Sequence, residues 1–69
     1  MVTRINRNRL RSERISQGLS QEDLARLADV TKNTVERMEN RENYNTTLET
    51  IGKVANALGL KAVDLILEE

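Results

Sequence analysis

A chain of 69 residues has room for one folded domain, so we expect a single domain over residues 1–69. It contains no Cys and no His, which excludes disulfides and the commonest metal ligands and leaves helix packing, or a partner subunit, to stabilise a thin core. With no phosphate-cradling glycine loop and no room for a pocket, we expect neither an enzyme nor a binder of a cofactor, metal or small molecule. No apolar run is long enough for a signal peptide or a membrane span, which predicts a cytoplasmic protein.

The formal net charge is zero, but the charges are unevenly distributed along the chain. Residues 1–41 hold nine Lys or Arg against six Asp or Glu, and residues 42–69 hold two against five. The first part is therefore net positive by three and the second net negative by three. This asymmetry suits a molecule with one face toward phosphate and another toward solvent or a second subunit.

The apolar spacing is helical throughout, and no segment has the pattern of a strand. The first predicted helix covers about residues 6–17, with Leu10 on its inner face and Ile15 beside it. Gly18 follows, where a left-handed glycine can end a helix and let Leu19 fold back onto the last turn.

The second predicted helix, residues 21–28, begins after Ser20, a good N-cap residue with Asp23 three residues later to complete a capping box. The third, residues 32–40, begins after Thr31 and carries Val35 and Met38 as its apolar positions. The buried stripe expected on the second helix is Leu24, Ala25, Leu27 and Ala28.

These two helices have the spacing of a helix-turn-helix over about residues 21–40. The small Ala25 lies where the next helix must cross closely, Val35 packs back beneath it, and Val30 is buried in the turn. Such a corner leaves one face of the third helix pointing outward. The residues on that face are Lys32, Asn33, Glu36 and Arg37.

Two more helices follow a polar stretch, at about residues 48–58 and 61–67. The cap of the first is either Thr46, with Glu49 completing a capping box, or Thr47, and Gly52 within it is expected to permit close packing. Gly59 ends this helix as Gly18 ends the first. Its expected apolar face is Leu48, Ile51, Val54, Ala55 and Leu58.

The outward face of the third helix carries the groups that a major groove selects. Lys32 and Arg37 can donate to guanine, and Asn33 can bond bidentately to adenine. Glu36 could accept from cytosine or form a spaced pair with Lys32 along the helix, and the pair is the simpler interpretation.

Several segments in order along the chain resemble the lambdoid phage repressor and Cro family, which includes xenobiotic-response-element-like regulators and controller proteins of restriction–modification systems. The segments are Arg14 to Gln21, Leu24-Ala25, Thr31 to Asn40, Leu48 to Ile51 and Ala55 to Gly59. The resemblance implies an all-α, compact five-helix domain like that of lambda repressor, with the helix-turn-helix at its second and third helices.

The resemblance also implies roles for individual residues. Gln21 matches a glutamine that bonds the phosphate backbone and braces the recognition helix, and Arg14 and Glu39 match an internal ion pair. The positions that reach base edges are Lys32, Asn33 and Arg37. Further positions expected to contact the DNA backbone are Thr34, Asn40 and Arg41.

Two features depart from the family pattern. Asp29 stands at the turn position that usually holds Gly, and Asp adopts the left-handed conformation less readily. After Asn40 the family often has Gly and later Pro, whereas this chain has Arg41 and Tyr44-Asn45, so the resemblance does not predict the path of that loop or a minor-groove contact from it.

The function expected from these observations is sequence-specific binding of double-stranded operator DNA by a transcriptional regulator, a repressor, acting as a homodimer. Val63 and Leu67 are apolar residues beyond those needed to close the core, and together with the loop before the predicted helix at residues 48–58 they predict the dimer surface. The alternative is a protein-interaction adaptor or antitoxin-like module that keeps the fold without binding DNA.

Overall fold

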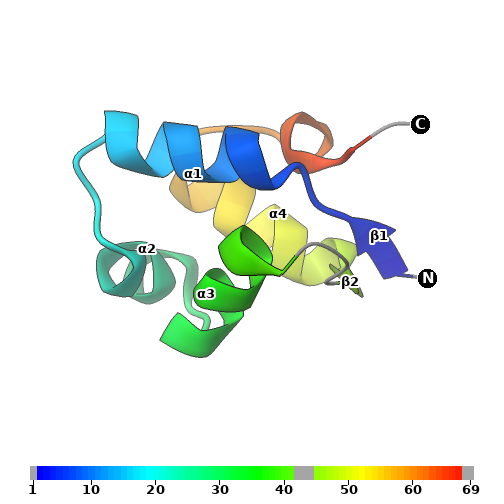
Figure 1. Cartoon of the computed structure of the whole chain (residues 1–69), viewed down its shortest axis with the longest axis horizontal. Helices are drawn as coiled ribbons and strands as arrows, with labels where there is room; N and C mark the ends of the chain where they lie inside the picture. The colour runs from blue at the N-terminus through cyan, green and yellow to red at the C-terminus, as the bar shows by residue number, and fades with distance from the viewer. Residues whose placement is uncertain (1, 42–44, 68–69) are drawn as a thin grey trace.

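A computed structural model describes residues 2–41 and 45–67 of the chain, and Figure 1 shows their arrangement. Helices cross one another around a common centre, and a small pair of strands lies at one end. In chain order the elements are β1 (Val2–Arg4), α1 (Arg7–Ser16), α2 (Gln21–Ala28), α3 (Lys32–Asn40), β2 (Asn45–Thr47), α4 (Leu48–Ala57) and the short 3-10 helix η1 (Ala62–Leu65).

The described residues form four α-helices, so the prediction of a fifth over residues 61–67 is wrong. A single 3-10 turn forms instead, in which the Asp64 carboxylate accepts from the Lys61 N–H at 2.9 Å. The chain then becomes extended, because Ile66 forms a β-bridge with Ile5 and the Leu67 N–H donates to the Arg4 carbonyl at 3.1 Å. Pairing with the N-terminal segment thus replaces the last helical turn.

The expectation that the chain has no strand is also wrong. β1 and β2 pair antiparallel, with Val2 opposite Thr47, Thr3 opposite Thr46 and Arg4 opposite Asn45. Each strand has three residues, which is too short to show an alternating pattern in a sequence. Only the fold brings residues 2 and 47 together.

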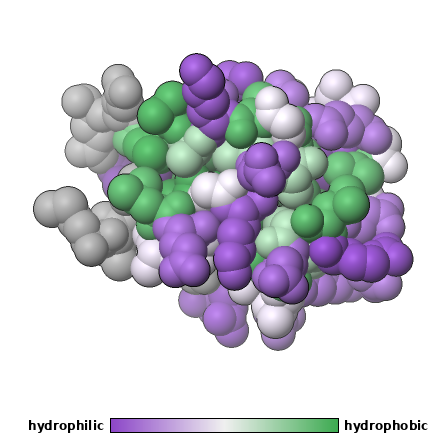
Figure 2. All heavy atoms as spheres, turned by 180° about the vertical axis from the view of Figure 1, so that it is seen from behind, coloured by the Kyte–Doolittle hydropathy of each residue, from purple (hydrophilic) through white to green (hydrophobic). Residues whose placement is uncertain are grey.

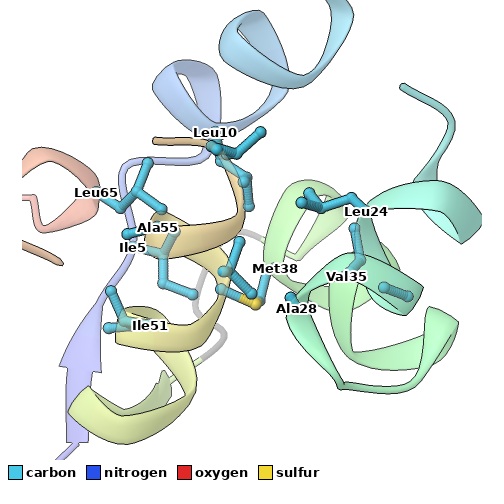
Figure 3. Close-up of a cluster of buried hydrophobic side chains, with 12 residues drawn as sticks. Ile5, Leu10, Leu24, Ala28, Val35, Met38, Ile51, Ala55 and Leu65 are labelled. Atoms are coloured by element: carbon cyan, nitrogen blue, oxygen red, sulfur yellow. The ribbon is translucent and has the colours of Figure 1, made fainter. Parts of the chain in front are cut away.

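The core lies where the four helices meet. In Figure 3 Met38 of α3 occupies the centre, with Leu24 and Val35 on one side and Ile5 and Ile51 on the other. Helix periodicity predicted most of these positions, whereas Ile5 enters the core from the segment before α1. The buried apolar residues are Ile5, Leu10, Leu24, Ala25, Ala28, Val35, Met38, Ile51, Val54, Ala55, Leu58 and Leu65.

Three apolar residues assigned to buried faces are exposed, namely Ile15, Leu27 and Leu48. Leu27 lies roughly a third of a turn from the centre of the buried stripe of α2. Leu48 is the first residue of α4 and precedes that helix's buried face. The expected close packing at Gly52 is wrong too, because a Cβ placed there would have no neighbouring atom within 4 Å.

The predicted helix caps are confirmed. Ser20 and Asp23 form the full capping box of α2, and Thr31 caps α3. At α4 the cap is Thr47, whose hydroxyl accepts from the Thr50 N–H at 3.3 Å, and Thr46 is instead a buried residue of β2. These caps place the start of each helix of the motif within one residue of its predicted position.

Candidate nucleic-acid interface

The turn between α2 and α3 is held by backbone hydrogen bonds and one left-handed residue. Asp29 has φ 58° and ψ 45°, so it adopts the conformation that glycine usually supplies here. The Val30 N–H reaches back to the Ala25 carbonyl at 3.0 Å, and the Thr31 hydroxyl accepts from the Thr34 N–H at 3.2 Å. With Ala25 and Val35 buried beneath it, the corner fixes which face of α3 points outward.

That outward face carries hydrogen-bond donors that the protein itself does not use. Lys32, Asn33 and Arg37 are exposed, and within residues 2–41 and 45–67 none of their side chains makes a hydrogen bond or an ion pair. The arginines of α1 and α2 contrast with them, since Arg9 pairs with Glu13 and Arg26 with Asp23. The groups predicted to read bases are therefore free to bind a partner.

Polar side chains also surround an open hollow of about 250 Å³ along α3. Its lining residues are Asn33, Glu36, Arg37, Asn40 and Arg41. Glu36 is half-buried, and in the described part of the chain it does not pair with Lys32, so the simpler interpretation of Glu36 is wrong. Two residues predicted to contact the DNA backbone, Asn40 and Arg41, therefore border the same surface as the base-reading candidates.

Thr34, which is also predicted to contact the DNA backbone, does not line this hollow. Thr34 is half-buried, and its hydroxyl lies 2.9 Å from that of Thr31, the cap of α3. It therefore takes part in the helix cap, which leaves less of its hydrogen-bonding capacity for DNA.

A buried ion pair ties α1 to α3 behind this face. The Arg14 Nε donates to Glu39 at 2.6 Å and its Nη2 at 2.9 Å, while its Nη1 donates to the Leu19 carbonyl at 2.7 Å. The side chain of Arg14 is 12% exposed and that of Glu39 only 1%. The hydrogen bonds to Glu39 raise the pKa of the guanidinium despite its burial. This is the pair that the family resemblance implied.

Gln21 contacts the recognition helix, as the family resemblance implied. Its Nε2 donates to the Glu39 carboxylate at 3.3 Å, so Glu39 receives donors from both α1 and the first residue of α2. The side chain is held against the end of α3, which is the bracing role, and the contact of Gln21 with the phosphate backbone stays a prediction. The helix patterns alone do not bring positions 21 and 39 together, since 18 residues separate them.

The two residues predicted for the dimer surface lie away from this corner. Val63 in η1 is 65% exposed and Leu67, just after it, is 41% exposed. Figure 2, seen from behind, shows hydrophobic surface at the end of the molecule that holds η1 and also toward the opposite end. The loop before α4, also predicted to join the dimer, falls partly on residues 42–44, which lie outside the described residues.

The capped corner and the exposed polar face of α3 define a helix-turn-helix protein. The sequence matches the helix-turn-helix family over residues 10–65, and the chain belongs to this family. Comparison with curated proteins finds no match.

Solved structures with similar folds support the same assignment. The restriction-modification controller protein C.AhdI from Aeromonas hydrophila is 38% identical with a TM-score of 0.76, over 84% of this chain and 86% of that chain. The hypothetical transcription factor NHTF from Neisseria is 38% identical with a TM-score of 0.79, over 88% and 69%. A third, hydroxypropylphosphonic acid epoxidase from S. wedmorenis, is 30% identical with a TM-score of 0.74, but the match covers only 32% of that chain.

No helix among the described residues is long and apolar enough to cross a membrane. Nor do residues 2–41 and 45–67 group three or more Asp or Glu side chains as a metal site would require.

Proposed function

We propose that this protein is a transcriptional regulator that binds double-stranded DNA in a sequence-specific way. The observation that carries the proposal is the exposed face of α3, where Lys32, Asn33 and Arg37 offer unused donors on a rigidly capped corner. Arg and Lys are suited to guanine and Asn to adenine, and these pairings require a helix lying in the major groove. Two of the similar structures, a restriction-modification controller protein and a hypothetical transcription factor, are regulators by their names.

The residues around α3 provide contacts that do not depend on sequence. Arg41 and Asn40 lie exposed at its C-terminal end, and Gln21 lies at the start of α2, where backbone N–H groups and the helix dipole favour a phosphate. Contacts on two sides of the recognition helix would set its depth and register in the groove. Thr34 would contribute through its remaining hydroxyl capacity.

We further propose that the protein is a homodimeric repressor acting on a two-fold symmetric operator. Val63 in η1 and Leu67 just after it are exposed, and the segment that carries them lies at the opposite end of the molecule from α2 (Figure 1). A dimer contact there would leave the exposed face of α3 uncovered. A repressor needs only to occupy its site, and the proposal assigns this chain no chemistry, cofactor or small-molecule ligand.

Selection of bound duplexes from a random pool tests the proposal directly. The expected product is a two-fold sequence whose half-sites are about 10 base pairs apart, because recognition helices of such dimers enter successive major grooves about 34 Å apart. A protein-interaction adaptor with the same fold would enrich no sequence. Failure to enrich any duplex at low salt would reject DNA binding, and enrichment of single half-sites would reject only the dimer.

A further inference from the structure

We propose that Arg7 is an additional DNA-backbone contact, which brings α1 into the interface and rests on the proposed function. Its Nη1 donates to the main-chain carbonyl of Asn40 at 3.4 Å, although 33 residues separate the two in sequence. The first residue of α1 therefore lies at the last residue of the recognition helix. Figure 1 shows the N-terminal half of α1 passing over this end of α3.

The position adjoins the proposed DNA-binding surface. Asn40 and the next residue, Arg41, line the hollow along α3 together with Arg37. Both Asn40 and Arg41 are exposed. The Arg7 guanidinium thus adds one more cation to Arg37 and Arg41 at the C-terminal end of α3. This cation comes from the N-terminal end of α1.

The positive charge of Arg7 is available to a ligand. Among the described residues no carboxylate pairs with it, and the Asn40 carbonyl takes one of the five N–H donors of a guanidinium. Two residues further along α1, Arg9 is paired with Glu13 at 3.3 Å. Arg7 is also half-buried, so less side-chain freedom remains to be lost when a phosphate binds.

A cation is needed at this place for an electrostatic reason. The C-terminal end of a helix carries a partial negative charge, about half an elementary charge, on its unpaired carbonyls. That end of α3 would repel a nearby phosphate. By donating to the Asn40 carbonyl, Arg7 offsets this charge and holds its remaining donors at the last residue of α3. Since the contact holds the guanidinium at the helix end, it suits a backbone phosphate rather than a base edge.

Binding of a cognate and a random duplex, measured from 50 to 200 mM salt, tests the role of Arg7. The variants are Arg7→Ala and Arg7→Gln, because Gln keeps an N–H donor for the Asn40 carbonyl but loses the charge. Arg9→Ala is the matched control, since it removes the same charge from the same helix at a residue already paired with Glu13. Thermal unfolding of each variant checks that the fold is retained.

Loss of one phosphate contact should reduce the slope of log K against log salt by about one. Arg7→Ala and Arg7→Gln should each weaken binding to the cognate and the random duplex by similar factors. The loss of affinity relative to wild type should be about 3-fold to 4-fold smaller at 200 mM than at 50 mM salt. Arg9→Ala should keep the wild-type slope.

The outcomes separate this inference from the proposed function. A wild-type salt slope for Arg7→Ala would overturn the phosphate contact. A wild-type slope for Arg7→Gln alone would also overturn it, because the charge would then not matter and Arg7 would have only a structural role at Asn40. Equal slopes for Arg7→Ala and Arg9→Ala would overturn it as well, since general charge would then explain both. If wild-type protein binds no duplex at all, the proposed function itself fails.

Discussion

The polar residues of α3 divide into those that hold the fold and those left for a partner. Glu39 is buried and receives hydrogen bonds from Arg14 and Gln21, whereas Arg37 and Asn33 are exposed and make none in the described part of the chain. A buried carboxylate without partners would be strongly destabilising, so the first group is structural. An exposed group without partners costs little, so the second group is free to determine specificity.

Replacing Arg37 or Asn33 by Ala tests the proposed base readout. Each change should weaken binding at the selected site by about 1–3 kcal/mol and relax the preference at one base position, because a bidentate base contact would be lost. Arg41→Ala is the control and should weaken cognate and random duplexes by similar factors. Repeating the random-pool selection with each variant gives the measurement, and an unchanged selected sequence would show that the face is misassigned.

The ion pair between Arg14 and Glu39 should contribute far more to stability than a surface pair. Removing either partner leaves a charge in a site where the side chains are 12% and 1% exposed, so each single variant to Ala should cost about 3–5 kcal/mol. The double variant should lose clearly less stability than the sum of the two single losses. Urea unfolding of wild type and the three variants gives the free energies of this double-mutant cycle.

The same cycle on Arg9 and Glu13 provides the comparison. These side chains are 43% and 30% exposed, so their coupling should be about 0.3–0.5 kcal/mol, as for other pairs one turn apart on a helix. Equal coupling in the two cycles would remove the argument that burial makes the Arg14 pair special.

Among the elements, the helices of the motif were predictable because their signals are local. Ser20 with Asp23, Thr31 and the glycine after α1 each mark a boundary within a few residues, and the structure places α2 and α3 within the predicted limits. The apolar spacing also identified Leu24, Val35 and Met38 as core. Local chemistry of this kind does not depend on distant parts of the chain.

The elements that sequence did not predict depend on distant pairing. β1 and β2 are joined by hydrogen bonds between residues more than 40 apart, and the bridge of Ile66 with Ile5 replaces the end of the predicted fifth helix. The contacts of Gln21 with Glu39 and of Arg7 with Asn40 are likewise products of how helices cross. No periodicity within one segment reports such contacts.

The cap of α2 should give the protein's stability a measurable dependence on pH. The Asp23 carboxylate accepts from the Ser20 N–H at 3.1 Å and from Arg26 at 2.8 Å, and the bond from the Ser20 backbone is the main cause that lowers its pKa. A lowered pKa in the folded state means that the carboxylate stabilises the fold above its unfolded pKa. That contribution is lost as the pH falls through the folded value.

Thermal unfolding of Asp23→Asn and wild type between pH 7 and pH 2.5 checks this dependence. The variant should melt at a lower temperature than wild type at neutral pH. The difference should begin to shrink as the pH falls below about 4 and should close only as the pH passes through the lowered folded pKa, where the wild-type carboxylate becomes protonated. Glu22→Gln is the control, because its side chain makes no hydrogen bond within the described residues. It loses only the attraction of a carboxylate to the start of the helix, so at neutral pH it should melt closer to wild type than Asp23→Asn does. A difference for Asp23→Asn that persists unchanged into acid would contradict the assignment.

At the scale of the whole molecule, basic and apolar surfaces lie in different places. The unused cations, including Arg37 and Arg41, lie along α3, while exposed Val63 and Leu67 lie at η1 and just beyond it. Since the second surface does not include the exposed residues of α3, a dimer formed through it would leave both recognition helices uncovered. The two surfaces can therefore be tested separately.

Val63→Glu should disrupt the dimer and leave the subunit folded. Val63 is 65% exposed, so the charge meets solvent in the monomer, but it would be buried without a partner in a dimer interface. We expect sedimentation to show a weakened dimer, thermal unfolding to remain near that of wild type at low protein concentration, and operator binding to become weaker and lose its cooperativity.

Val63→Lys should weaken the dimer as well, although its positive charge is attracted to DNA. This variant therefore separates the loss of apolar contact from electrostatic repulsion of the duplex. Ile15→Glu places the same acidic charge at another exposed apolar residue and should leave sedimentation unchanged. If wild type and both Val63 variants sediment equally as monomers and bind the operator equally well, the dimer surface lies elsewhere or the protein acts as a monomer.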